Sequence, residues 1–157
     1  MMRVRLTRLL PVAVVLLAGC SGGTVRDLEK LLTYLSSDSP RARARAEKSL
    51  AEHGRTFIKP LSNILTGEDL DQTVEDYNIK ADPASLRVPA AKALGVIAAK
   101  ASLARSEAET AAEPLLEALW DEDRAVRIAA AKALGQFTQL SEPANDLILL
   151  LREDDEA

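Results

Sequence analysis

The stretch Asp121–Gly135 reads DEDRAVRIAAAKALG and decides the fold of this chain. Its acidic turn leads into a segment in which Val126, Ala130, Ala133 and Phe137 recur at helical spacing on one side. Alanines on that side allow a neighbouring helix to come close. The stretch therefore predicts a helix that packs against other helices along a face of small residues.

The same pattern recurs twice upstream. Residues 86–95 (LRVPAAKALG) match residues 126–135 at seven of ten positions, 40 residues apart. Residues 42–50 keep the Arg, Ala, Lys and Leu of the pattern, and residues 31–35 keep the leucines of residues 115–119. The repeating unit is thus a pair of helices with a period of roughly 40 residues, which is typical of a helical solenoid.

This motif of proline, leucines, acidic turn, Val-Arg and Ala-Ala-x-Ala-Leu-Gly resembles the HEAT repeat, in particular the short bacterial form also found in phycobilin lyases. The resemblance covers roughly residues 25–153. It implies an all-α fold, a short right-handed α-solenoid of about three helical hairpins plus a terminal helix. It also implies a ladder of side chains that bond from one repeat to the next. In this chain the ladder would use Asp121, Asp123, Arg43, Arg87 and Arg127.

Local signals place several helix ends. Thr24 with Asp27, and Ser106 with Glu109, have the spacing of capping boxes that open helices. Pro40 fits the first turn of a helix, where its missing N–H costs nothing. The first helix is therefore expected to start at Thr24, the second at about residue 40, and the third A helix at Ser106.

Residues 1–19 have the form of a signal peptide. Three arginines precede an apolar run over residues 9–19, which is too short to cross a bilayer because a spanning helix needs about 20 residues. Residues 17–20 read Leu-Ala-Gly-Cys and resemble the bacterial lipobox. This resemblance implies that Cys20, the only cysteine, is acylated and becomes the new amino terminus. The alternative is an ordinary signal peptide with a chance cysteine.

Cleavage before Cys20 leaves a lipidated tether of residues 20–24 and a HEAT-repeat domain of residues 25–157. It also removes three arginines and no acidic residue, so the formal net charge changes from −4 to −7. Such an acidic protein disfavours nucleic acid and anionic head groups as its general partner. Ser21 stands where enteric lipoproteins retained in the inner membrane carry aspartate, which favours the outer membrane. We therefore expect a lipid-anchored protein on the periplasmic side of a bacterial membrane.

The second repeat carries an acidic insert at about residues 66–82. Its interval from the helix-A proline to the helix-B arginine is 14 residues longer than in the third repeat. Long insertions on one face of a solenoid often carry function, but a solvated, mobile acidic loop is the simpler interpretation. An EF-hand loop starting at Asp69 would need glycine and glutamate where the chain has Val74 and Lys80, so the insert does not fit a calcium site.

The sequence contains few side chains that could act in catalysis. His53 is the only histidine, and it lies near a predicted helix end, where histidine most often caps the helix or points to water. The lone cysteine is consumed by lipidation, and the chain has no glycine-rich phosphate loop. The paired carboxylates of the insert lack the apolar surroundings of a general acid. We therefore expect no enzyme activity, no metal site and no cofactor.

Two features indicate binding. Lys48, Lys92 and Lys132 hold the same place in the three B helices, which line the concave face of HEAT solenoids, so they would form a positive stripe. The alternative is a solvated position that readily accepts lysine. Trp120 is the second candidate because tryptophan is enriched at interface hot spots, although at a helix end it more often packs at the rim of the core.

The sequence therefore predicts a membrane-anchored HEAT-repeat scaffold or adaptor that binds a protein of the bacterial cell envelope. A lyase-like or chaperone-like accessory factor is one alternative, supported only by the analogy of fold with the phycobilin lyases. A purely structural spacer is the other.

Overall fold

The computed structural model describes residues 27–137. Within this range the regular structure is helical, without strands, and the expected all-α fold is confirmed. The elements are α1 (Leu28–Leu35), α2 (Pro40–His53), η1 (Gly54–Phe57), α3 (Ile58–Thr66), α4 (Leu70–Asp76), α5 (Pro83–Lys100), α6 (Arg105–Glu117), η2 (Ala118–Trp120) and α7 (Arg124–Leu134). The η elements are short 3₁₀ helices. The predicted signal peptide, Cys20 and the terminal helix lie outside the described residues.

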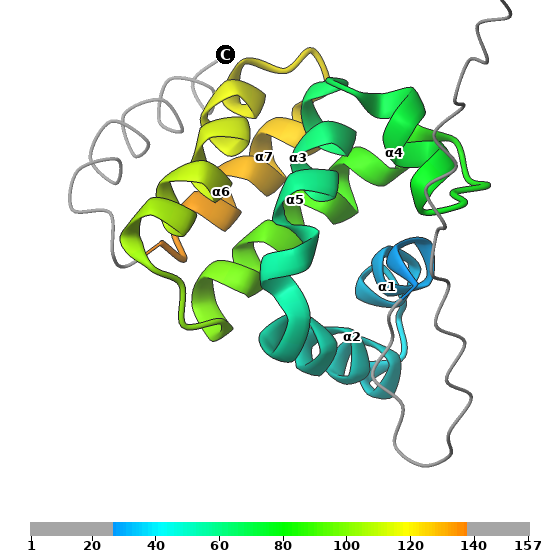
Figure 1. Cartoon of the computed structure of the whole chain (residues 1–157), viewed down its shortest axis with the longest axis vertical. Helices are drawn as coiled ribbons and strands as arrows, with labels where there is room; N and C mark the ends of the chain where they lie inside the picture. The colour runs from blue at the N-terminus through cyan, green and yellow to red at the C-terminus, as the bar shows by residue number, and fades with distance from the viewer. Residues whose placement is uncertain (1–26, 138–157) are drawn as a thin grey trace, which may run out of the picture.

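The helices pair into three hairpins (Figure 1). α1 packs against α2, α3 against α5, and α6 against α7, while α4 belongs to the insert between α3 and α5. Between hairpins, α3 packs against α6, and α5 packs against both α2 and α7. The second helices of the hairpins therefore form one layer, as in a short α-solenoid of three repeats.

Polar side chains just before four of the helices bond to their first amides. Asp27, Ser39, Asp82 and Asp123 precede α1, α2, α5 and α7, and each accepts a hydrogen bond from a main-chain N–H of the first turn. Pro40 directly follows Ser39, at a position where the helix needs no N–H. The start of α2 confirms the prediction near residue 40, whereas α1 is capped by Asp27 and not by the expected Thr24.

The start of α6 differs from the prediction. The helix begins at Arg105, and Ser106, the expected cap, lies in its first turn. The Glu107 carboxylate accepts a hydrogen bond from the main-chain N–H of Ala104 at 2.8 Å. Alanine has no side-chain acceptor to return a second bond, so α6 has one half of a capping box.

α5 is the central helix of the structure. It packs against α1, α2, α3, α6 and α7. A helix with several neighbours buries residues around most of its circumference, and on α5 the side with Lys92 and Ala99 stays exposed. The buried residues of α5 are Leu86, Pro89, Ala90, Ala91, Ala93, Leu94, Gly95, Ile97 and Ala98. Most of these residues are small, which allows several helices to approach α5 closely.

The repeated alanine positions are buried, as the pattern predicts. Ala46, Ala90 and Ala130 hold the same place in α2, α5 and α7, and each is 0 % exposed. Ala133 and Phe137, on the same side of the third unit, are each 4 % exposed. The helical register read from the sequence is therefore confirmed.

The acidic insert is folded, which corrects the expectation of a solvated loop. α4 packs on α3, where the Asn63 side-chain amide donates a hydrogen bond to the Thr73 hydroxyl at 2.9 Å, both residues being buried. After α4, the Tyr77 ring lies 6.5 Å from the Phe57 ring, and Ile79 is buried. These few apolar and polar anchors fix a segment whose composition is otherwise that of a loop.

The insert also contacts the first hairpin. The main-chain N–H of Lys80 donates a hydrogen bond to the Glu29 carboxylate of α1 at 2.6 Å. α1 itself packs on α5 as well as on α2. The first hairpin is therefore held by the second repeat and by its insert together.

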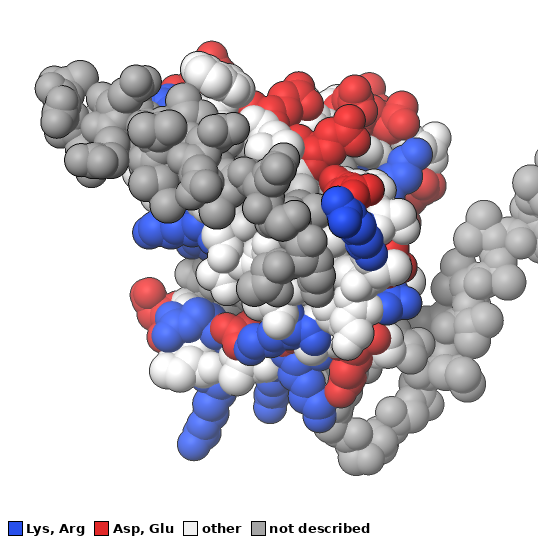
Figure 2. Space-filling model, turned by 90° about the vertical axis from the view of Figure 1, so that its left-hand side faces the viewer, with Lys and Arg blue, Asp and Glu red and all other residues white. Residues whose placement is uncertain are grey.

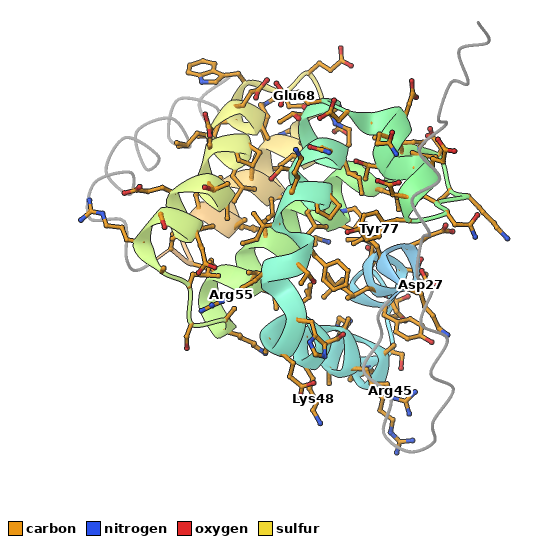
Figure 3. The ribbon with its side chains drawn as sticks, viewed as in Figure 1. Asp27, Arg45, Lys48, Arg55, Glu68 and Tyr77 are labelled. Carbon is orange, nitrogen blue, oxygen red and sulfur yellow. The ribbon has the colours of Figure 1, made fainter. Side chains whose placement is uncertain are left out.

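Charged side chains are segregated along the long axis of the molecule (Figures 2 and 3). Figure 3 shows Glu68 at one end, and Arg45 and Lys48 of α2 at the other, directed away from the rest of the structure. The acidic end includes the exposed carboxylates of the insert, which are Glu68, Asp69, Asp71, Glu75 and Asp76. The formal net charge of −4 thus conceals a separation of charge between the insert and α2.

Candidate binding groove

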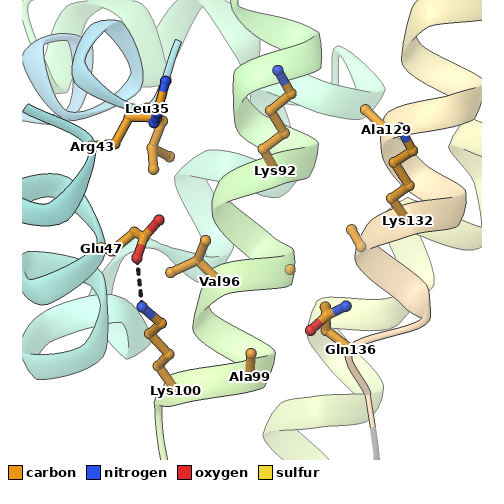
Figure 4. A pocket seen from close by; sticks show the side chains of 12 residues that line it. Leu35, Arg43, Glu47, Lys92, Val96, Ala99, Lys100, Ala129, Lys132 and Gln136 are labelled. Carbon is orange, nitrogen blue, oxygen red and sulfur yellow. Dashed lines mark hydrogen bonds and ion pairs between the residues drawn. The ribbon is translucent and has the colours of Figure 1, made fainter. Parts of the chain in front are cut away.

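A groove of about 340 Å³ crosses the three second helices, α2, α5 and α7 (Figure 4). Its floor is apolar. Gly95, Ala129 and Ala133 contribute small groups, and Leu35 and Val96 contribute larger ones. The small residues that let α5 and α7 approach each other also leave a hollow above their line of contact. The groove is therefore a consequence of the alanine-rich repeat.

Four cationic side chains line the groove, and the three that do not pair with Glu47 come one from each second helix (Figure 4). These three are Arg43 of α2, Lys92 of α5 and Lys132 of α7, and all three residues are exposed. The Arg43 guanidinium donates a hydrogen bond to the Ser37 carbonyl at 3.0 Å, which holds it beside the α1–α2 turn. Neither lysine forms an ion pair with a described residue. Their charges are available to an acidic ligand.

Lys48 does not line the groove with Lys92 and Lys132, which corrects the expected positive stripe of three lysines. It lies 3.9 Å from Glu52 on another face of α2, while Arg43 and Glu47 of that helix line the groove. Lys48 follows Glu47 by one residue, and one residue is a rotation of about 100° around a helix. Sequence reasoning placed Arg43 in the ladder and overlooked Glu47. The signal that could have found both is their four-residue spacing, which puts them on one side of α2.

One ion pair crosses the end of the groove between two repeats. The Glu47 carboxylate of α2 lies 2.5 Å from the Lys100 ammonium of α5 (Figure 4). Both side chains are about half exposed to water, so this pair contributes about 0–1 kcal/mol to stability. Its effect is chiefly on the shape and charge of the groove, because it neutralises one of the cations along the wall.

Among the described residues, the pair Arg87–Asp121 of the expected ladder links successive repeats. Arg87 of α5 forms an ion pair with Asp121 in the turn between η2 and α7. The Asp121 side chain is 5 % exposed and the Arg87 side chain 27 %. The Arg87 guanidinium also donates a hydrogen bond to the Leu65 carbonyl at 3.3 Å, so it joins α3, α5 and the third hairpin.

The bonds resolved for the other ladder residues lie within their own repeats. Asp123 caps α7 by accepting a hydrogen bond from the first turn. Arg127 donates to the carbonyls of residues 121 and 122 at 2.9 and 3.2 Å, and closes the acidic turn against α7. Arg43 closes the α1–α2 turn in the same way. The repeated arginines Arg43, Arg87 and Arg127 thus fix the turn inside each hairpin, and Arg87 also joins the second hairpin to the third.

Trp120 lies on the surface and not at the rim of the core. It is 76 % exposed and borders a second hollow, of about 300 Å³, which Arg87 and Asp121 also line. Leu116, one helical turn earlier, is 42 % exposed. An exposed indole beside an exposed leucine is the arrangement of an interface anchor more than that of a packed aromatic residue.

The described titratable side chains show little of the clustering that catalysis or metal binding requires. Within residues 27–137, no three His, Cys, Asp or Glu side chains are placed to hold a metal ion together. His53 is half-buried at the last residue of α2. Burial raises the pKa of the Tyr77 hydroxyl, and the neighbouring Asp76 carboxylate raises that pKa further, so the hydroxyl is a weaker acid than usual.

Among the described helices, none combines the length and the hydropathy needed to cross a bilayer.

Three hairpins that share one layer of second helices and one groove define a short α-solenoid. The family model for HEAT repeats matches residues 77–157, slightly more than half of the chain, and the chain belongs to this family. HEAT-repeat proteins are typically scaffolds for protein–protein interaction. No curated protein and no solved structure matches the chain.

Proposed function

We propose that this protein is a lipid-anchored scaffold that binds an acidic segment of another protein of the bacterial cell envelope. The binding site is the groove over α2, α5 and α7. The observation that carries the proposal is the meeting, in one groove, of an apolar floor with a cation from each of three successive hairpins. A segment with apolar side chains on one side and carboxylates along its edge would satisfy both parts of the groove.

The two parts of the groove have different roles in this proposal. Burial of apolar area against the floor supplies affinity, at about 25 cal/mol per Å². Arg43, Lys92 and Lys132 attract the partner and set the position of its carboxylates along the groove. Because these cations are exposed, their contribution falls as salt is added.

The anchor is proposed from the sequence. Acylation of Cys20 would hold the scaffold on the periplasmic side of a membrane, and Ser21 favours the outer membrane. Asp27, where the described fold begins, follows Cys20 by seven residues. The groove would therefore be presented close to the bilayer surface, and partners that are themselves in the envelope would meet it there.

The groove is tested by reversing its central charge. Tagged protein is recovered from envelope extracts with its bound partner, and we expect Lys92→Glu to weaken that binding by about tenfold at low salt. The loss shrinks as salt is raised, because charges more than about 10 Å apart are screened at 0.1 M. Lys48→Glu is the matched control, since Lys48 holds the same place in the repeat but lies outside the groove.

A second control tests the insert as the alternative site. Lys80→Glu changes the charge of the insert and leaves the groove intact. Binding that is weakened by Lys80→Glu and unchanged by Lys92→Glu would assign the site to the insert. A tightly bound small chromophore in place of a protein would favour the lyase-like alternative, and the absence of any bound partner would favour the spacer.

The anchor has its own test. Cys20→Ser removes the thiol that would be acylated, so labelled palmitate should no longer enter the protein, and the protein should leave the membrane fraction. Palmitate incorporated into the Cys20→Ser protein would refute the assignment of Cys20.

A further inference from the structure

A stripe of cations runs along the outer side of α2. Arg41, Arg45 and Lys48 are spaced by four and three residues, so they lie on one face of the helix. All three are exposed, and the two arginines form no ion pair with a described residue. Glu52 continues the stripe and lies 3.9 Å from Lys48. The stripe keeps a net positive charge of two.

This basic stripe lies at the end of the molecule opposite the acidic insert. In Figure 3 the Arg45 and Lys48 side chains extend beyond the body of the structure, whereas Glu68 marks the far end. In Figure 2, along the same axis, acidic side chains gather at the upper end and basic ones at the lower end. A charged planar surface would therefore attract one end of this molecule and repel the other, whatever its net charge.

The stripe is close in sequence to the proposed anchor. The seven residues from Cys20 to Asp27 reach about 25 Å when fully extended. The eight residues of α1 add about 12 Å before the chain turns into α2. An acylated Cys20 would thus keep α2 within reach of the lipid head groups at all times.

We propose that Arg41, Arg45 and Lys48 form a docking surface for the anionic phospholipid head groups of the membrane that holds Cys20. This inference rests on the proposed lipid anchor. Exposed lysines and arginines are attracted to anionic head groups over about a Debye length, and the anchored chain is long enough to let them come within that distance. The surface orients the scaffold with α2 at the membrane and the acidic insert away from it.

The docked orientation leaves the groove accessible. Arg43 and Glu47, which line the groove on α2, lie on a different side of the helix from the stripe. A partner segment in the groove and a lipid surface on the stripe therefore occupy separate faces of α2. The scaffold would bind its partner in a fixed direction relative to the membrane.

The test measures the distance of two labelled positions from the head groups. A cysteine placed at Ala44, which is exposed on α2, or at Glu68 is the only free thiol of the acylated protein, and carries a fluorophore. The full acylated chain is reconstituted in vesicles of phosphatidylcholine, with or without phosphatidylglycerol, that contain a head-group quencher. We expect stronger quenching at Ala44 than at Glu68, in the phosphatidylglycerol vesicles only and less in high salt.

Charge reversal of the stripe should abolish this difference. The triple variant Arg41→Glu, Arg45→Glu, Lys48→Glu should lower the ratio of docked to undocked protein at least about tenfold. The triple variant Lys59→Glu, Lys80→Glu, Arg124→Glu makes the same change of net charge on exposed residues of other elements, and should leave docking unchanged. Circular dichroism verifies that both variants are folded.

The outcomes separate the two proposals. Protein that does not associate with any vesicles overturns the anchor and the docking surface together. Protein that associates but shows equal quenching at both labels, or unequal quenching without phosphatidylglycerol, overturns the docking surface alone. The same loss of docking in both triple variants would mean that net charge, and not the stripe, governs the orientation.

Discussion

Gly95 of α5 lies against Ala133 of α7 so closely that a methyl group on Gly95 would come within 2.9 Å of the Ala133 Cα and 3.0 Å of its Cβ. Both residues line the floor of the groove. The contact between the second and third repeats therefore depends on a residue without a side chain. The depth of the groove depends on the same contact.

We expect Gly95→Ala to lower the free energy of unfolding by about 1–3 kcal/mol, because α5 and α7 must separate to admit the methyl group. Gly135→Ala is the matched control. A Cβ there meets only carbonyl oxygens, the nearest being that of Lys132 at 3.5 Å. Urea denaturation measures both variants. Equal midpoints would show that the two helices are not in close contact.

Ala130→Leu should cost about 1–3 kcal/mol in the free energy of unfolding. Ala130 is 0 % exposed, and a larger side chain cannot enter its site without displacing neighbouring helices. Ala125 lies on the exposed side of the same helix, where the same substitution should change the stability by less than about 0.5 kcal/mol. An unchanged denaturation midpoint for Ala130→Leu would place that face of α7 in solvent.

Arg87→Ala should destabilise the protein by about 3 kcal/mol, because it leaves the buried Asp121 carboxylate without its cation. A double-mutant cycle with Asp121→Asn should show a coupling of about 1–3 kcal/mol between the two side chains. Lys100→Ala removes the exposed pair with Glu47 and should cost about 0–1 kcal/mol. An equal loss of stability in Arg87→Ala and in Lys100→Ala would mean that the Asp121 carboxylate is solvated.

Tyr77 should titrate above its ordinary range. Burial raises the pKa of the hydroxyl and Asp76 raises it further, so the folded protein holds the proton more tightly than the unfolded chain, whose tyrosines have a pKa of 10.0. The resulting stability is present below pH 10 and is lost as the pH rises through the folded pKa. Tyr77→Phe should reduce the fall in stability above pH 10.

The chain has two tyrosines, so Tyr77 can be followed alone in a Tyr34→Phe background. Phenolate absorbance should then rise with a midpoint above pH 10 while the protein is folded, and near pH 10 in denaturant. A midpoint at or below 10 in the folded protein would show that the Tyr77 hydroxyl is not buried.

Much of the fold could be predicted from the sequence because its determinants are local and repeated. The alanine positions typified by Ala130 recur at helical spacing, and the buried face of each second helix follows from that spacing alone. Ser39 caps α2 through a bond to the amide three residues ahead, and Pro40 follows it directly, so the start of this helix is visible in a few adjacent residues. The all-α solenoid and the layer of second helices follow from these features.

Only the tertiary structure decided the features that depend on how the helices are rotated or on contacts between residues far apart in the sequence. The insert folds because Thr73 bonds to Asn63 and Tyr77 packs near Phe57, and neither partner belongs to the insert. Its acidic composition, read by itself, favours a solvated loop.

The groove and the three cations that line it, Arg43, Lys92 and Lys132, were likewise decided by the tertiary structure. Lys48 matches Lys92 and Lys132 in the repeat, yet Arg43 lines the groove in its place, because α2 turns the side with Arg43 and Glu47 toward the groove. The sequence determined which residues recur and which helices form. Which side chains meet across the repeats was determined by how those helices rotate and pack, because such contacts join residues that no local pattern connects.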